Sequence, residues 1–117
     1  DFSGLFRLLG VMRRDEGKTQ AYRFFWRKTA SVDAPLAAFH HFTNEAGSFL
    51  HGVNVDPGRG LFSLEEIEPG TEFSYELRVN LPPTARHLNV GLYDKRDVVR
   101  RVPCGDATYR TLDLEAG

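Results

Sequence analysis

The feature that most limits the fold is an alternating segment at residues 71–94, TEFSYELRVNLPPTARHLNVGLYD. Apolar and polar side chains alternate in its first half, and a Pro-Pro turn leads into a second alternating run. A period of two places successive side chains on opposite faces of a strand, so one face is predicted to be buried. The residues predicted for the core on this basis are Phe73, Tyr75, Leu77, Val79, Val90 and Leu92.

The same alternation recurs between turn signals along the rest of the chain. Further strands are predicted at residues 5–12, 20–28, 36–43, 48–53, 98–102 and 108–114. Turns or loops rich in Gly, Pro, Asn and Asp are predicted at residues 15–18, 31–35, 44–47, 54–60 and 68–71. Residues 61–67 suit either one capped helical turn or an irregular edge segment, and we favour the edge segment.

Many short strands without a strong helix signal predict an all-β domain. We expect one antiparallel β-sandwich of about eight strands, immunoglobulin-like or jelly-roll-like, spanning residues 1–117. A chain of 117 residues can bury a core of its own. Its single cysteine excludes an internal disulfide.

Charge and hydropathy exclude several classes of partner. The chain has 15 basic and 16 acidic residues and a formal charge of −1, so its overall field does not favour nucleic acid. No apolar run approaches the roughly 18 residues that span a bilayer. The chain opens on Asp1 without a signal-peptide pattern. We therefore expect a piece of a longer protein, with any targeting signal or membrane anchor outside these residues.

The order of several short motifs resembles a known family. FSGLFRLLGV, YRFFWRK, AFHHFTNEAG, DPGRG, EPGTEFSYELRVNLPP and NVGLYD follow one another between residues 2 and 102. This order resembles the β-sandwich modules at the extracytoplasmic C-termini of some bacterial membrane glycosyltransferases and uncharacterised membrane proteins. The sequence departs from the family's pattern at Val53-Asn54, where aspartates are common, and at Ile67-Glu68, where a tryptophan is common. The resemblance implies an accessory, extracytoplasmic module of the cell envelope.

The histidines suggest a metal site at first, but their spacing does not suit one. His40 and His41 are adjacent, and neighbours on a strand point to opposite faces, so they cannot easily hold one ion together. The sequence has no H-x-H or HExxH motif and no cysteine pair. The family resemblance places a strand histidine at His41, so we expect it to be a structural histidine, hydrogen-bonded to the backbone or to a tyrosine.

No motif for catalysis is present. The chain lacks G-x-S-x-G, and Cys104 lies in a Pro-Cys-Gly turn, where an ordinary turn cysteine is expected despite two nearby arginines. Glu65, Glu66 and Glu68 share one short segment, which is typical of a solvated surface rather than of two carboxyls across a cleft. We expect a protein that is not an enzyme.

Two sets of polar residues are candidate sites, one for a metal cation and one for an anionic ligand. Asn44-Glu45, Asn54 and Asp56 offer oxygen ligands to a structural Ca²⁺, although turn-forming residues explain the composition equally well, and no cofactor is predicted. The basic stretch at residues 95–101 suits an anionic glycan, a lipid headgroup or nucleic acid. A solvated hairpin balanced by the acidic residues of 65–76 is the favoured interpretation.

The aromatic residues indicate the most specific candidate site. Trp26 shares a face with other aromatics and is assigned to the core, whereas Phe25 lies on the opposite face between Arg23 and Arg27. Phe25 is therefore either an exposed platform or a residue buried on the second face of its strand. The candidate ligand-binding residues are Phe25, Asn54, Asp56, Arg59, Phe62 and Tyr93.

These residues predict a non-catalytic carbohydrate-binding or cell-envelope interaction module whose partner is a glycan or another protein domain. The alternative is a structural spacer or docking domain that packs on a membrane enzyme or partner subunit and has no ligand of its own.

Overall fold

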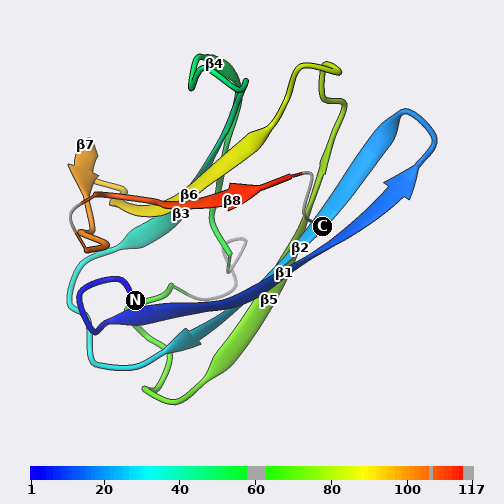
Figure 1. The fold of residues 1–117 in the computed structure, drawn as a ribbon. Helices are drawn as coiled ribbons and strands as arrows, with labels where there is room; N and C mark the ends of the chain where they lie inside the picture. Colours follow the sequence, from blue (N-terminus) through cyan, green and yellow to red (C-terminus); the bar gives the residue numbers. More distant parts are fainter. Residues whose placement is uncertain (58–62, 106, 115–117) are drawn as a thin grey trace.

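The structure is a computed structural model that describes residues 1–57, 63–105 and 107–114. These residues form eight strands and no helix (Figure 1). The strands are β1 (Phe6–Glu16), β2 (Thr19–Lys28), β3 (Leu36–Thr43), β4 (Phe49–Val55), β5 (Glu72–Val79), β6 (His87–Asp94), β7 (Asp97–Arg101) and β8 (Arg110–Asp113). In this part of the chain, no helix has the length and apolar character needed to cross a membrane.

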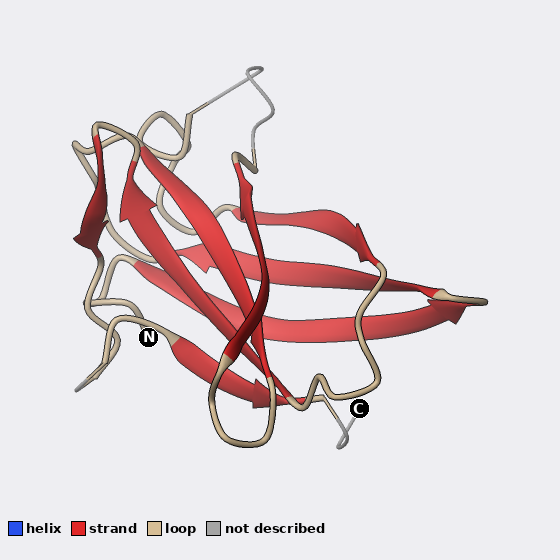
Figure 2. Ribbon diagram, turned by 90° about the horizontal axis from the view of Figure 1, so that it is seen from above, coloured by secondary structure: helices blue, strands red, loops and turns tan. Residues whose placement is uncertain are grey.

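The strands form two antiparallel sheets packed face to face, which confirms the predicted β-sandwich (Figure 2). The first sheet has the order β1-β2-β5, and the second has the order β4-β3-β6-β7 with β8 also pairing with β6. Strands A, B and E of an immunoglobulin-like sandwich share one sheet and strands C, F and G the other. The observed order follows this pattern, with β4 added beside β3, so it matches the immunoglobulin-like alternative.

The core lies between the inner faces of the two sheets. The alternation in β2 buries Tyr22, Phe24 and Trp26, and each of them is at most 2% exposed. The residues predicted for the core from residues 71–94 all pack there, with Phe73 partly buried. Burial of aromatic and aliphatic side chains from both sheets supplies the main driving force for this packing.

A buried hydrogen-bonded chain crosses the core from one sheet to the other. Trp26 Nε1 donates to Tyr75 Oη at 3.3 Å, and Tyr75 Oη lies 2.7 Å from His40 Nε2. His40 Nδ1 lies 3.0 Å from the carbonyl oxygen of Val53. The structural histidine bonded to a tyrosine and to the backbone is therefore His40, and the assignment of this role to His41 was wrong. His41 lies on the other face of β3, as the alternation predicts.

Lys28 is a buried lysine at the C-terminal end of β2. Its side chain follows Trp26 on the inward face and is 1% exposed. The ammonium donates to the carbonyl oxygens of Leu64 at 2.8 Å, Glu65 at 3.2 Å and Ile67 at 2.6 Å. These bonds satisfy the buried charge and hold the turn that follows Ser63 against the sandwich.

Several predicted boundaries shift. β1 continues to Glu16, so the predicted loop at 15–18 is a tighter turn around Gly17, whose φ is 66°. Asn54 and Val55 belong to β4 and pair with β3, so the predicted loop at 54–60 begins too early. Asp56 and Pro57 follow the strand, and residues 58–62 lie outside the described part of the chain. Residues 64–67 form turns rather than a helix.

Candidate functional site

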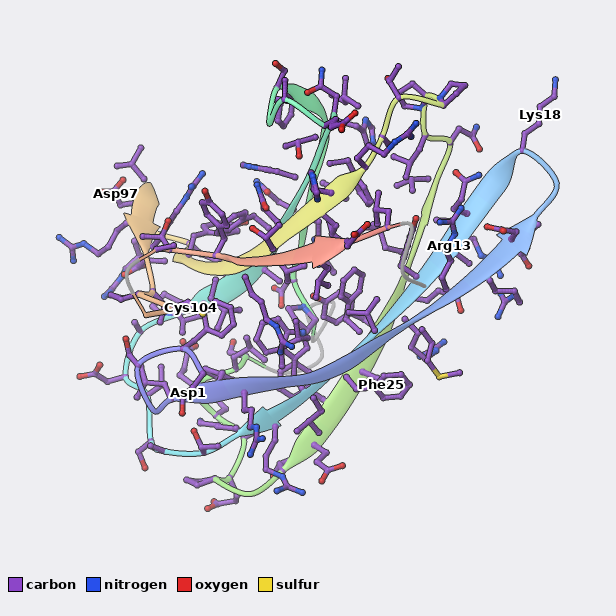
Figure 3. The ribbon with its side chains drawn as sticks, viewed as in Figure 1. Asp1, Arg13, Lys18, Phe25, Asp97 and Cys104 are labelled. Carbon is purple, nitrogen blue, oxygen red and sulfur yellow. The ribbon has the colours of Figure 1, made fainter. Side chains whose placement is uncertain are left out.

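Phe25 lies at the centre of the outer face of the first sheet. The register pairs it with Gly10 on β1 and with Ser74 on β5, so a small residue stands on each side of the ring. Figure 3 shows Phe25 pointing away from the second sheet. Phe25 is half-buried on this outer face, which is between the exposed platform and the buried position predicted for it.

A groove of about 620 Å³ surrounds this ring. The pairing of β1 with β2 shifts register between Leu8 and Gly10, so Leu9 bulges from the ladder. Leu9 is 41% exposed and Met12 is 65% exposed, and both line the groove with Phe25. The groove therefore combines an aromatic ring with a flexible apolar wall.

Charged side chains border the groove on the β2 and β5 side. Arg27 forms an ion pair with Glu72, a groove-lining residue. Arg23 donates to Ser74 Oγ at 3.2 Å and to Glu76 at 3.2 Å. These groups can donate and accept hydrogen bonds beside the aromatic ring. These cross-strand pairs also restrict the positions of the Arg23 and Arg27 side chains.

Glu76 is the centre of the charge network on this face. Its carboxylate accepts hydrogen bonds from Arg78 at 2.8 Å, from Arg23 at 3.2 Å and from Arg14 at 3.4 Å. The hydrogen bond from Arg78 is the main cause that lowers the pKa of Glu76, so the carboxylate stays ionised.

The other candidate residues that the structure describes lie away from Phe25. Asn54 pairs with Phe39 across β3 and β4, and Tyr93 pairs with Arg101 across β6 and β7, which places both on the outer face of the second sheet. Asp56 forms an ion pair with Lys95 at 3.1 Å. The last two candidates, Arg59 and Phe62, lie outside the described residues. The structure therefore does not bring Phe25 together with Asn54 and Tyr93.

The outer face of the second sheet carries an aromatic row that sequence reasoning missed. The Arg101 guanidinium lies 4.3 Å from the ring centre of Phe39. The Phe39 and His41 rings lie 4.9 Å apart, and the His41 and Phe49 rings lie 5.3 Å apart. Burial, followed by the charge of Arg101, lowers the pKa of His41. The alternation along residues 39–41 could have predicted this row in part, because it places Phe39 and His41 on the same face of the strand.

The basic hairpin has acidic partners from more than one segment. Arg96 forms an ion pair with Asp94 at 2.7 Å, and Lys95 pairs with Asp56. The hydrogen bond from the Arg96 guanidinium is the main cause that lowers the pKa of Asp94 to about 2. Glu65, from the acidic segment 65–76, is also among the charges that raise the pKa of Arg96, so this segment contributes to the balance of the hairpin. Two other acidic residues of that segment, Glu72 and Glu76, pair with arginines of the first sheet.

The candidate calcium ligands have other contacts. The Asn44 side chain accepts a hydrogen bond from the backbone N–H of Ser48 at 2.9 Å, which closes the β3–β4 turn. Within residues 1–57, 63–105 and 107–114, no three or more His, Cys, Asp or Glu side chains gather as a metal site would require. Cys104 is half-buried and lies in a short bridge with Ala107.

The comparisons with known proteins leave the structure as the main guide to function. No protein-family model matches this sequence, and a comparison with curated proteins finds no matching relative. The resemblance to glycosyltransferase-associated modules stays a prediction.

Proposed function

We propose that this domain is a non-catalytic carbohydrate-binding module and that a sugar ring stacks on Phe25 in the outer groove of the first sheet. The observation that carries the proposal is the row formed by Gly10, Phe25 and Ser74. Small residues on both sides leave space over the aromatic ring. Large side chains at the positions of Gly10 and Ser74 would cover the Phe25 ring and leave no space for a ligand.

The chemistry around the groove suits a sugar. An aromatic face accepts the apolar C–H face of a pyranose, and nearby polar groups fix the orientation of its hydroxyls. Glu72 lines the groove, and Arg27 pairs with it. The carboxylate accepts hydrogen bonds from hydroxyls and the guanidinium donates them. The motif order in the sequence supports an extracytoplasmic, envelope-associated setting for such a module.

Docking of another protein domain is the second candidate function. The exposure of Leu9 and Met12 beside Phe25 favours it, because flexible apolar side chains adapt to protein surfaces. In this alternative, the same groove packs on a partner domain and binds no free glycan.

A titration with envelope oligosaccharides, followed by ¹H–¹⁵N NMR, tests the proposal. We expect shifts to gather on β1, β2 and β5 around residues 10, 25 and 74. Phe25→Ala should weaken the affinity about tenfold, the loss typical of removing an aromatic anchor. Phe49→Ala is the matched control, because Phe49 is 61% exposed on the opposite sheet and should leave binding unchanged.

The outcomes separate the two functions. Shifts that gather on the aromatic row of the second sheet, or equal affinity of the Phe25→Ala variant, would contradict the proposed site. Absence of shifts with every glycan, together with capture of a partner domain that Phe25→Ala abolishes, would support docking instead.

A further inference from the structure

We propose that a second pocket, on the inner side of the β1–β2 hairpin, binds a small carboxylate. The hairpin extends beyond the second sheet, and its inner side faces the connection between β5 and β6 (Figure 1). The pocket has a volume of about 540 Å³, within the usual range for small-molecule sites. Its lining includes Arg13, Gln20 and Tyr22 from the hairpin and Pro82 and Pro83 from the connection.

The first observation is a buried hydroxyl without a partner. Tyr22 is 2% exposed and lines the pocket. Its Oη atom is buried, and no atom of the described residues forms a hydrogen bond with it. An unpaired buried hydroxyl is costly, and native proteins usually satisfy it with an internal partner or a bound molecule. Tyr75, the other buried tyrosine of the core, has both partners within the protein.

The second observation is that hydrogen-bond donors line the same pocket as Tyr22. The Arg13 guanidinium lies 5.8 Å from the ring centre of Tyr22, held by Asp15 at 2.9 Å and by the carbonyl oxygen of Leu114 at 3.1 Å. Figure 3 shows Arg13 on the side of the hairpin that faces the second sheet. Gln20 Oε1 accepts the backbone N–H of Leu81 at 3.1 Å, which leaves its NH₂ group as a donor.

The hydrogen-bond donors of the pocket select the class of ligand. The Arg13 guanidinium, the Gln20 NH₂ group and the Tyr22 hydroxyl can all donate hydrogen bonds, so the lining favours a ligand with several acceptor oxygens. Arg86 is anchored on the connection by the carbonyl oxygens of Pro83 at 2.7 Å and Ala85 at 3.0 Å. A carboxylate accepts hydrogen bonds from guanidinium, amide and hydroxyl donors at the same time.

This pocket is separate from the Phe25 groove. Tyr22 and Phe25 are an odd number of residues apart on β2, so their side chains project to opposite faces of the first sheet. Ligand binding in the second pocket can therefore be measured independently of ligand binding in the Phe25 groove. A Phe25→Ala variant is expected to bind a carboxylate in the second pocket as well as the unaltered protein does.

Titration with D-glucuronate, with glucose as the neutral control and inorganic phosphate as a second anion, tests the proposal by ¹H–¹⁵N NMR. Glucuronate should shift the side-chain NH₂ signals of Gln20 and the backbone signals near Tyr22, and glucose should not. Tyr22→Phe should weaken glucuronate binding at least tenfold. It should keep or raise the melting temperature without ligand, because the lost hydroxyl has no hydrogen-bond partner among the described residues.

Two further variants keep the test decisive. Tyr75→Phe should lower the melting temperature, because it removes the bonds to Trp26 and His40, while glucuronate binding stays intact. Gln20→Leu should weaken binding without touching the tyrosine. Four results would each overturn the proposal: equal binding by Tyr22→Phe, glucose shifts at Gln20 and Tyr22 as large as those with glucuronate, tighter binding of phosphate there, or no shift of these signals with glucuronate.

Discussion

Two adjacent histidines show how much a single residue's environment decides. His40 is fully buried between Phe24 and Tyr75, and His41 is half-buried on the outer face. The hydrogen-bonded chain fixes the neutral form of His40: Nδ1 donates to the Val53 carbonyl and Nε2 accepts from the Tyr75 hydroxyl. Burial is the largest cause that lowers the pKa of His40 to about 4.

The low pKa of His40 predicts that the fold is less stable in mild acid. An unfolded histidine binds a proton near pH 6.5, whereas folded His40 binds one only near pH 4. Stability is therefore complete above pH 6.5 and falls as the pH drops towards 4. Between pH 7.5 and pH 5.0 the loss should be about 2 kcal/mol, measured by urea unfolding.

The matched variants assign this pH dependence to one residue. His40→Gln keeps a donor and an acceptor but does not titrate, so it should remove most of the loss between pH 7.5 and pH 5.0. His41→Gln should keep most of it, because His41 is only half-buried. An unchanged pH profile in His40→Gln would contradict the role assigned to this side chain.

At the scale of strands, two glycines on outer faces have different roles. On β6, a Cβ at Gly91 would lie 2.2 Å from Phe39 Cζ and 2.7 Å from the backbone oxygen of Thr108. On β1, a Cβ at Gly10 would meet no heavy atom within 4 Å. Gly91 therefore permits close packing over the second sheet, whereas Gly10 leaves open space beside Phe25.

This difference predicts opposite effects of the same substitution. Gly91→Ala should lower the free energy of unfolding by about 2 kcal/mol, because the methyl group overpacks a site bounded partly by backbone. Gly10→Ala should change it by no more than about 0.5 kcal/mol, as an ordinary surface substitution does. Denaturant unfolding of both variants provides the measurement, and equal losses would contradict the assignment.

At the scale of the whole molecule, one core joins the two sheets. Trp26 is the only tryptophan, and it lies in that core with its indole bonded to Tyr75. The first sheet presents its aromatic face to the inward residues of β3 and β6. Neither sheet can therefore lose its partner without exposing a large apolar surface.

The shared core predicts that both sheets unfold in one cooperative step. Tryptophan fluorescence reports on the contact between the sheets, and far-UV circular dichroism reports on the strands of both. Their urea transitions should have the same midpoint, as two-state unfolding requires. A fluorescence transition that precedes the loss of strand signal would show that the sheets separate first.

Much of this architecture was predictable from local patterns. Alternation placed Trp26 inside and Phe25 outside, and it separated His40 from His41. The same alternation extends to Lys28 on the inward face of β2, but no local rule indicates which carbonyl oxygens receive its ammonium. Those oxygens come from a turn more than thirty residues later, and only the folded chain brings them together.

The sequence alone determined which side of each strand faces inward, because the side-chain period of a strand is a local property of the backbone. It therefore determined the sandwich, the core and the outward position of Phe25. Only the tertiary structure decided which outward residues share a surface. Sheet order and register are set by packing between distant segments, and they placed Asn54 and Tyr93 on one sheet, Phe25 on the other, and Tyr22 beside a pocket on the inner side of the hairpin.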